Sequence, residues 1–236
     1  MKQPITHSWN VTPAEAIRIQ NEMIRPAVRC RKVPRRAHRI GGADVSFDED
    51  RKIAVAGIIV WDMVRREVVE QVYGVAPLRF PYVPGLLTFR EGPAILAAWW
   101  KLACPPDVVM FDGTGYAHPR RCGLACHLGV LLDVPSIGVA KSRLCGAADE
   151  PGPRRGESTD WFDRGELVGR VVRTRDRVAP LFISVGHRAT LDDAVRLTLA
   201  CGTRYRLPEP TRLAHQFVTA TKLRLAPASL PDPDAV

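Results

Sequence analysis

Residues 40–75 read IGGADVSFDEDRKIAVAGIIVWDMVRREVVEQVYGV, and this stretch decides the fold. It contains three apolar or alternating runs, at 40–47, 53–61 and 67–75, which are typical of β-strands. The links between these runs are short and polar, such as 48–52. Because parallel strands need a much longer crossover, short links favour antiparallel hairpins. The stretch therefore predicts three consecutive antiparallel strands.

Helical and strand-like segments alternate after this unit. The pattern predicts a helix that follows the Phe80–Gly85 loop and runs to about Cys104, then strand 108–111, helix 124–132, strand 136–140, strand 167–173, strand 181–185, helix 191–201 and helix 210–225. The run at 53–61 is apolar on both faces, which indicates a sheet covered on both sides. We therefore predict an α/β fold with one mixed sheet, three antiparallel strands and then parallel strands, and helices on both faces.

A further helix is predicted before the sheet, from Thr12 to about Arg29. Thr12 and Glu15 have the spacing of a capping box, and Pro13 stands at the first helical position. Because a proline removes a helical hydrogen bond, Pro26 should kink or shorten this helix.

The composition is that of a globular protein with an excess of positive charge. Lys and Arg number 34 against 25 Asp and Glu, which gives a formal net charge of +9. The longest apolar run, 53–61, is about half of the ~20 residues that a membrane span needs, and residues 1–30 contain no apolar signal-peptide core. We expect a soluble, cytoplasmic protein without membrane contact, with a single domain over residues 1–225 and a disordered tail over 226–236.

Two local clusters allow more than one interpretation. Residues 29–39 carry six basic side chains and no acid, which is typical either of a phosphate-binding surface or of a solvated connector. Cys122, Cys126 and His127 lie close together, but a zinc site usually needs a second close pair of ligands. Core packing is therefore the expected role of these three residues.

Two aspartates interrupt apolar strands. Asp44 alternates with the apolar residues of its strand, so in a covered sheet it would be partly buried and would need a cation or hydrogen-bond donors. Asp112 ends strand 108–111 and precedes Gly113, which places a carboxylate at the carboxyl end of a central strand, where open α/β sheets hold their sites. The alternatives are a hydrated edge position for Asp44 and an ordinary turn for Asp112.

Glu91 also has two interpretations. Thr88 and Glu91 have capping-box spacing, so Glu91 could simply fold back on Thr88. Pro93 favours a helix that is capped by Gly92, in which case Glu91 would precede the helix and project freely. Three carboxylates on two strands and one helix start are the oxygen ligands that Mg²⁺ prefers, and such sites hydrolyse phosphodiesters, although sequence spacing cannot bring the three together.

Six segments of the chain, in this order, resemble the endonuclease V family over about residues 40–215: GGADVSFD (41–48), PYVPGLLTFRE (81–91), FDGTGYAHPRRCG (111–123), GVAKSRLCG (138–146), GHR (186–188) and YRLPEPTRLAH (205–215). The resemblance implies a ribonuclease H-like fold and a Mg²⁺-dependent repair nuclease for deaminated bases, chiefly hypoxanthine, with Mn²⁺ as a substitute. Family members nick the strand at the second phosphodiester bond 3′ of the lesion and leave 3′-hydroxyl and 5′-phosphate ends.

The resemblance also implies roles for single residues. Asp44, Glu91 and Asp112 correspond to the metal-binding carboxylates, Lys141 to the active-site lysine, and His215 to a further catalytic residue. The loop of Pro81, Tyr82, Val83 and Pro84 corresponds to the wedge that replaces an extruded base. The base pocket is expected to involve Gly85, Leu87, Gly113, His118, Gly123, Ala140 and Ser184. Thr114 and Cys126 depart from the residues expected in the family, which bears on the range of substrates.

We therefore expect a monomeric endonuclease whose partner is double- or single-stranded DNA with deaminated bases. One alternative is an inosine-specific ribonuclease acting on inosine-containing RNA, or another ribonuclease H-like nuclease such as the nuclease half of a nucleotide-excision incision protein. A second alternative is a nucleic-acid-binding module that has lost its chemistry. The three intact carboxylates argue against that module.

Overall fold

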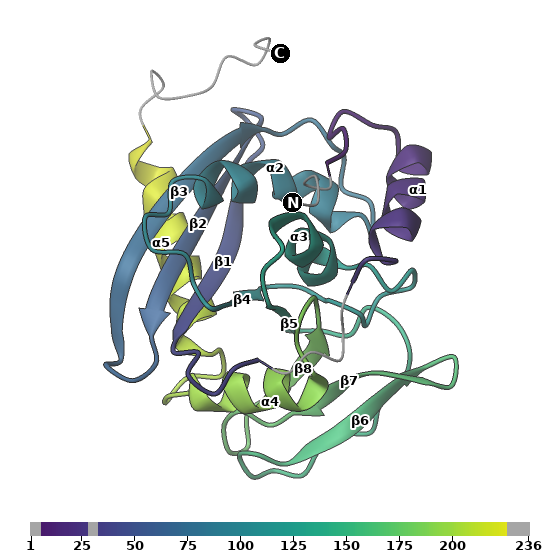
Figure 1. Ribbon diagram of the computed structural model, residues 1–236, viewed down its shortest axis with the longest axis vertical. Coiled ribbons are helices and arrows are strands. Elements are labelled where there is room, and N and C mark those ends of the chain that lie inside the picture. The colour runs from purple at the N-terminus through teal and green to yellow at the C-terminus, as the bar shows by residue number, and fades with distance from the viewer. Residues whose placement is uncertain (1–5, 28–32, 226–236) are drawn as a thin grey trace.

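The three predicted antiparallel strands form one end of the sheet in the computed structural model (Figure 1). The structure describes residues 6–27 and 33–225, and within them eight strands form one sheet in the order β3-β2-β1-β4-β5-β8-β7-β6. The strands are β1 (Arg39–Asp48), β2 (Ile53–Asp62), β3 (Glu67–Pro77), β4 (Val108–Phe111), β5 (Ser136–Ala140), β6 (Ser158–Asp163), β7 (Glu166–Val172) and β8 (Leu181–Val185). The helices are α1 (Pro13–Met23), α2 (Leu87–Trp99), α3 (Leu124–Leu132), α4 (Leu191–Ala200) and α5 (Glu209–Arg224).

The mixed sheet confirms the predicted fold class. The pairs β1–β2 and β2–β3 are antiparallel, and β4 and β5 follow as parallel strands. The parallel part is limited to β1, β4 and β5, because β8, β7 and β6 return to antiparallel pairing. Strand β6 was missed in the sequence, since only Trp161 of its six residues is buried and it carries no apolar run.

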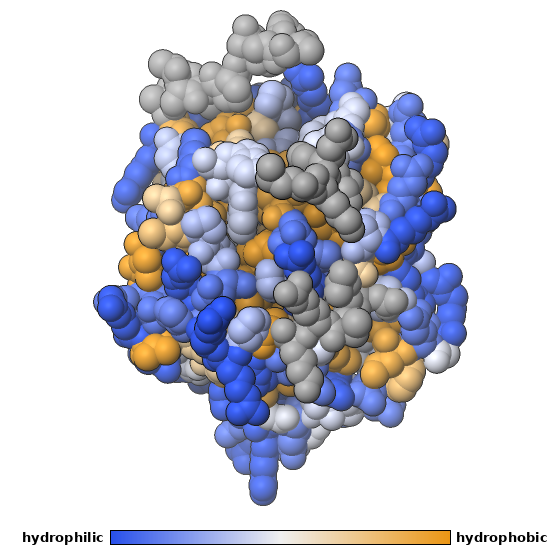
Figure 2. Space-filling model, in the orientation of Figure 1, coloured by the Kyte–Doolittle hydropathy of each residue, from blue (hydrophilic) through white to orange (hydrophobic). Residues whose placement is uncertain are grey.

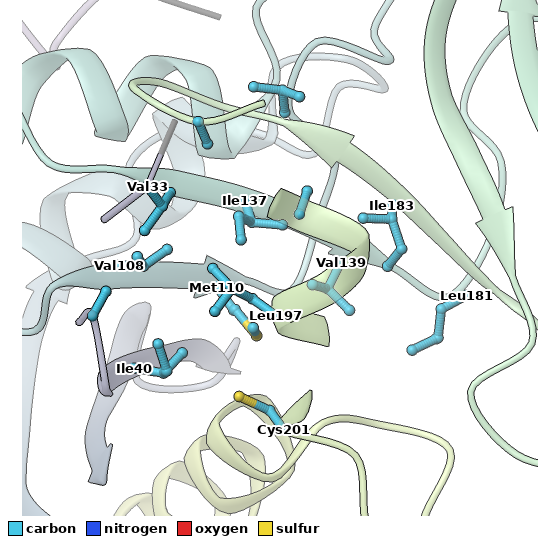
Figure 3. Packing of buried hydrophobic residues seen from close by; sticks show 14 of the residues in the cluster. Val33, Ile40, Val108, Met110, Ile137, Val139, Leu181, Ile183, Leu197 and Cys201 are labelled. Atoms are coloured by element: carbon cyan, nitrogen blue, oxygen red, sulfur yellow. The ribbon is translucent and has the colours of Figure 1, made fainter. Parts of the chain in front are cut away.

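Helices cover both faces of the sheet, as predicted (Figure 1). On one face, α4 and α5 pack on Ile40, Met110 and Ile137, in the core that Figure 3 shows from close by. On the other face, α2 and α3 pack on a second core that includes Phe111 and Ile58. Strand β2 lies between the two cores, and all its residues are buried. Burial of apolar area at about 25 cal/mol per Å² is the main force that holds these layers together.

Helix α1 ends earlier than predicted, at Met23 rather than near Arg29. The predicted capping box is present: the Thr12 side chain accepts from the Glu15 N–H, and the Glu15 carboxylate accepts from the Thr12 N–H. The prediction that Pro26 shortens the helix agrees with this early end. The basic stretch 29–39 lies partly outside the described residues, as does the predicted disordered tail 226–236.

Helix α2 corrects both interpretations of its start. It begins at Leu87 with Leu86 as N-cap, so neither Thr88 nor Gly92 caps it, and Pro93 lies inside the helix. Leu86 and Phe89 are almost completely buried, and their packing extends the helix toward the N-terminus in spite of the proline. Glu91 is consequently a helix-interior residue. No helix among the described residues is long and apolar enough to span a membrane.

Candidate nuclease active site

Strand pairing brings Asp44 and Asp112 side by side. In the parallel pair of β1 and β4, Ala43 lies opposite Phe111, and each of these residues is followed in the chain by one of the aspartates. The Asp112 N–H donates to the Ala43 carbonyl at 3.4 Å, which fixes the two backbones next to each other. The predicted position of a carboxylate at the carboxyl end of a central strand is therefore observed for Asp112.

Helix α5 brings His215 to the same place. Gly42 lets α5 lie directly on β1, since a Cβ at Gly42 would stand 2.1 Å from the Pro210 carbonyl oxygen. The His215 Nδ1 lies 2.7 Å from the Asp44 Oδ2. The Asp44 side chain is only 13% exposed and His215 is 57% exposed, so His215 covers the aspartate from the solvent side. The sequence expectation that a partly buried Asp44 needs a polar partner is met by this contact.

Lys141 approaches Asp112 from the next strand. Strand β5 is parallel to β4, with Gly138 opposite Phe111, and Lys141 directly follows the end of β5. Its Nζ contacts the Asp112 Oδ2 in an ion pair. The Lys141 side chain is 44% exposed, so it borders solvent as well as the carboxylate.

Glu91 completes a group of three carboxylates that repel one another. Burial raises the pKa of Glu91 well above its ordinary value, and the charges of Asp44 and Asp112 raise it further. Burial also raises the pKa of Asp44, as does Asp112, while His215 and Lys141 act in the opposite direction. The two aspartates thus disfavour ionisation of Glu91, and Asp112 also disfavours ionisation of Asp44. A cation between them would relieve this repulsion.

The donor set suits a hard cation such as Mg²⁺, because it consists of carboxylate oxygens. In their present rotamers no three His, Cys, Asp or Glu side chains of residues 6–27 and 33–225 are close enough together to form a metal site. Two of the three carboxylates instead contact side-chain nitrogens, Asp112 that of Lys141 and Asp44 that of His215. The raised pKa of Asp44 and of Glu91 fits a cation here, because a cation would favour the ionised form of both carboxyls.

A cavity of about 210 Å³ adjoins the carboxylates. It is smaller than the roughly 300–1,000 Å³ of pockets for drug-sized ligands. Three lining residues lie close in the chain to the residues described above. Gly113 follows Asp112, Ala140 precedes Lys141, and Thr88 lies one turn before Glu91 on α2. The lining residues are Gln20, Tyr82, Val83, Pro84, Gly85, Leu87, Thr88, Gly113, Thr114, His118, Gly123, Leu124, Ala140, Ser142 and Leu144.

Six of the seven residues expected in a base pocket line this cavity, and Ser184 does not. Ser184 is fully buried, and its hydroxyl accepts from the Gly115 N–H at 2.8 Å, so it supports the turn behind Gly113. Gln20 and Ser142 were missed in the sequence. A signal was present for Gln20, since it is a polar residue on the face of α1 that buries Ala16 and Met23.

The loop before the cavity exposes an aromatic side chain. Tyr82 is 71% exposed, between two exposed prolines. The loop is fixed at its start, where the Arg90 Nη1 donates to the Phe80 carbonyl at 3.0 Å. It is fixed at its end by the Leu86 N–H, which donates to the Val83 carbonyl at 2.9 Å. A rigid loop thus presents Tyr82 beside the cavity.

His118 lies in the cavity wall as a neutral imidazole. Burial is the main reason that its pKa falls to about 4. The Arg120 N–H donates to the His118 Nδ1 at 3.1 Å, so the proton of the neutral ring is on Nε2, which lies 2.9 Å from the Gly85 carbonyl oxygen. His118 therefore offers a hydrogen-bond donor at the cavity.

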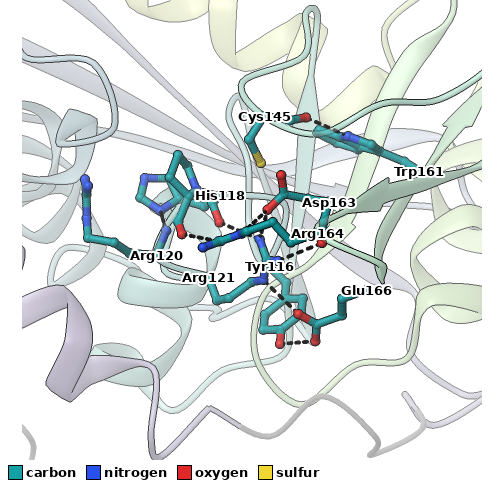
Figure 4. Close-up of polar contacts among 10 residues, drawn as sticks. Tyr116, His118, Arg120, Arg121, Cys145, Trp161, Asp163, Arg164 and Glu166 are labelled. Atoms are coloured by element: carbon teal, nitrogen blue, oxygen red, sulfur yellow. Dashed lines mark hydrogen bonds and ion pairs between the residues drawn. The ribbon is translucent and has the colours of Figure 1, made fainter.

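The loop that carries His118 is anchored to the β6–β7 hairpin (Figure 4). The Arg121 guanidinium donates to the Asp163 Oδ2 at 2.6 Å and to the Glu166 Oε2 at 2.9 Å, and the Tyr116 hydroxyl also contacts Glu166. Arg121 and Asp163 are each about 14% exposed, so this pair is partly shielded from water. Because Arg–carboxylate bonds are strong and directional, they hold the loop in one position.

The chain was compared with known proteins. The model of the endonuclease V family matches residues 22–216. The chain belongs to the endonuclease V family. The endonuclease V of Gloeobacter violaceus is 48% identical over 95% of this chain and 92% of its own length, and that of Myxococcus xanthus is 46% identical over 93% and 94%. Endonuclease V proteins are metal-dependent nucleases of DNA repair that act on deaminated bases.

Solved endonuclease V structures agree with the fold. The crystal structure of endonuclease V from Streptomyces avermitilis matches with a TM-score of 0.88 and 42% identity, over 93% of this chain and 96% of that one. Endonuclease V from Ciona intestinalis matches with a TM-score of 0.78 and 26% identity, over 90% and 98%, and was solved with a 24mer DNA containing an inosine followed by a ribo-adenosine. The predicted fold class and family resemblance are thus confirmed.

The cysteine cluster of the chain is part of the core. Cys122, Cys126 and His127 are completely buried. The Cys126 Sγ lies 3.4 Å from the Gly186 carbonyl oxygen, and the His127 Nε2 lies 2.7 Å from the Nε2 of His7. The expected packing role agrees with these contacts.

The pKa of His118 predicts a loss of stability in acid. Because its folded-state pKa of about 4 lies below the ordinary 6.5, the unfolded chain binds more protons between these values, and stability falls as the pH falls. His118 should contribute about 2 kcal/mol to the loss between pH 7 and pH 5. Urea unfolding of His118→Gln should show a loss smaller by that amount. If His118→Gln lost as much stability as the wild type between pH 7 and pH 5, the assignment of a neutral His118 ring would be contradicted.

Proposed function

We propose that this chain recognises a deaminated base in DNA, chiefly hypoxanthine, and hydrolyses the second phosphodiester bond 3′ of it, leaving 3′-hydroxyl and 5′-phosphate ends. One observation carries the proposal: a cavity below drug-ligand size, flanked by an exposed tyrosine on a rigid loop, opens beside a group of three carboxylates. The +9 net charge supports an anionic partner, since basic residues supply a salt-sensitive hold on phosphates.

Asp44, Glu91 and Asp112 would hold the metal ion, and we propose Mg²⁺, with Mn²⁺ as a substitute. When bound, the ion makes water a better nucleophile and stabilises charge on the leaving oxygen. The ionised carboxylates also disfavour a direct approach of phosphate, so the positive charge of Lys141 beside Asp112 helps to bring the scissile phosphate to them. His215 holds Asp44 through its Nδ1 and so fixes the orientation of that carboxylate.

Recognition is assigned to the cavity and the exposed loop. A base inside a duplex cannot reach the cavity unless it leaves the stack, and a mispaired hypoxanthine costs less to extrude than a sound base. Tyr82 can stack in the space that the extruded base leaves. Pro81 and Pro84 limit the conformations of the loop, so less entropy is lost when it inserts.

A second candidate is cleavage of inosine-containing RNA. The observation that favours it is the Ciona intestinalis structure, whose DNA carries a ribo-adenosine after the inosine. That ligand differs from plain DNA by a 2′-hydroxyl on the nucleotide after the lesion, the group by which proteins tell RNA from DNA.

The substrate experiment compares three strands of one sequence, each with a single inosine: all DNA, DNA with a ribonucleotide directly 3′ of the inosine, and all RNA. With Mg²⁺, the DNA strand should be cut at least as fast as the other two, and sequencing-gel mapping should place the cut at the second bond 3′ of inosine. Faster cleavage of the RNA would favour the second candidate. A cut at another bond would contradict the proposed position.

Metal binding should stabilise the fold measurably without turnover. A cation that binds only the folded chain adds about 2.7 kcal/mol of stability at a concentration one hundred times its dissociation constant. We expect Mg²⁺ to raise the thermal unfolding temperature of the wild type in calorimetry, and to have a much smaller effect on Asp44→Asn. Equal shifts in the two proteins would show that the ion binds elsewhere.

A further inference from the structure

Three side chains converge on one carbonyl oxygen in the cavity wall. The Gly85 carbonyl lies 2.9 Å from the Gln20 Nε2, 2.9 Å from the His118 Nε2 and 2.8 Å from the Arg120 Nη2. A carbonyl oxygen has two lone pairs, so three donors compete for two acceptor positions. Gly85 ends the exposed tyrosine loop in a left-handed conformation with φ of +79°, which a glycine adopts readily.

The side chains of Gln20 and Arg120 form a unit through a bond to each other. The Arg120 Nε donates to the Gln20 Oε1 at 2.6 Å. The amide nitrogen of Gln20 donates to Gly85 and also to the Cys122 carbonyl at 2.9 Å, so both of its hydrogens are used. Gln20 is 1% exposed, which means that water cannot replace these bonds. The unit therefore ties α1 to the two loops that form the cavity.

His118 differs from the other two donors in the bonds of its side chain. His118 and Gln20 both line the cavity, whereas Arg120 is absent from the lining. The Nε2–H of His118 is directed to Gly85 alone, whereas the side chains of Gln20 and Arg120 also bond to each other, and Gln20 donates to Cys122 as well. When a base with a carbonyl oxygen enters the cavity, His118 is the donor that can change partner.

We propose that Gln20 and Arg120 are positioning residues for base recognition: together they satisfy the Gly85 carbonyl, which frees the Nε2–H of His118 for a carbonyl oxygen on the extruded base. The inference rests on the proposed function, because it assumes that the base enters this cavity. According to this inference, His118 recognises the 6-oxo group of the deaminated purine. If either Gln20 or Arg120 is lost, the Gly85 carbonyl has only two donors left, and His118 stays bound to it.

The test compares two duplexes that differ at one base, deoxyinosine or the unsubstituted purine deoxyribonucleoside, which lacks the 6-oxo group and the N1 hydrogen. Dissociation constants are measured by fluorescence anisotropy in EDTA, so no strand is cut. Within one preparation the ratio of the two constants does not depend on the fraction of folded protein. The preference for inosine should fall about tenfold in Gln20→Met and in Arg120→Met, the effect of one hydrogen bond.

Three controls separate positioning from a structural defect. Gln71→Met, at an exposed position on the edge strand β3, should keep the full preference. Arg120→Lys retains a hydrogen-bond donor, so it should keep more of the preference for inosine than Arg120→Met does. In a His118→Ala background, Gln20→Met should change the preference no further, since the two residues act on one hydrogen bond.

The outcomes separate this inference from the proposed function. A third duplex carries adenosine at the same position, and if the wild type binds it as tightly as the inosine duplex, the proposed function fails and the inference fails with it. If the wild type prefers inosine but Gln20→Met and Arg120→Met keep the full preference over the purine duplex, the inference alone is overturned. The inference is also overturned if Gln20→Met lowers the preference for inosine equally in the wild-type and in the His118→Ala background.

Discussion

Asp112→Asn should abolish nicking of an inosine-containing duplex and leave binding of that duplex measurable. Asp112 lies beside Asp44 through the β1–β4 pairing, and an amide in its place removes one of the three carboxylates that would hold the cation. Because bound metal contributes several kcal/mol of charge stabilisation in such reactions, we expect the rate constant of the cleavage step to fall at least about 10³-fold. Single-turnover nicking at saturating Mg²⁺ measures it.

The matched control for this variant is Asp50→Asn. Asp50 is an exposed aspartate in the turn between β1 and β2, so the same chemical change there should leave the rate unaltered. The duplex affinity of Asp112→Asn should remain close to that of the wild type, since the cavity and the Tyr82 loop are intact. Turnover by Asp112→Asn near the wild-type rate would remove Asp112 from the metal site.

Tyr82→Ala should weaken binding rather than chemistry. Loss of one base–aromatic stack costs about 1–3 kcal/mol, which corresponds to a roughly 5–150-fold weaker affinity for an inosine duplex. The carboxylates are untouched, so single-turnover cleavage at saturating protein should fall far less than affinity. Electrophoretic mobility shift in EDTA gives the affinity.

Tyr73→Ala is the control for the tyrosine. Tyr73 is 38% exposed on the edge strand β3, and it contacts Lys101 rather than the cavity. Its removal should leave the inosine affinity unchanged. If Tyr82→Ala and wild type bound the inosine duplex equally well, the wedge role of the loop would have to be abandoned.

The strand pattern of residues 40–75 was sufficient to predict the fold class, because three adjacent hairpin-linked strands leave few arrangements for the alternating segments that follow. It also predicted which aspartates interrupt apolar strands. It could not predict that Asp44 and Asp112 are neighbours, since this depends on β4 pairing with β1 rather than with β3. Sequence distance carries no information about that choice.

The start of α2 shows a second limit. Pro93 is a strong local signal for a helix start, but Leu86 and Phe89 gain more by packing in the core than the proline costs, so tertiary burial overrides the local preference. Gln20 shows a third limit. Its polar side chain on the buried face of α1 indicated an internal partner, but the partners, Gly85, Arg120 and Cys122, lie far away in the sequence.

The sequence predicted the total charge of the protein but not where the charged residues lie on its surface. The net charge of +9 indicated an anionic partner, and Figure 2 shows one largely hydrophilic face with separate hydrophobic patches. The acidic residues of the candidate site lie within this basic chain, and a cation would reconcile them with phosphate. Salt-dependence measurements on variants of the basic stretch 29–39 test its contact with DNA.

The central claim is lesion-specific, metal-dependent nicking. It is tested most directly by two duplexes of one sequence, with inosine or adenosine at a single position, incubated with the wild-type protein with Mg²⁺ or with EDTA. The account predicts a nick in the inosine strand with Mg²⁺ and intact strands in the other three reactions. Equal cleavage of the two duplexes, or cleavage of the inosine duplex in EDTA, would contradict it.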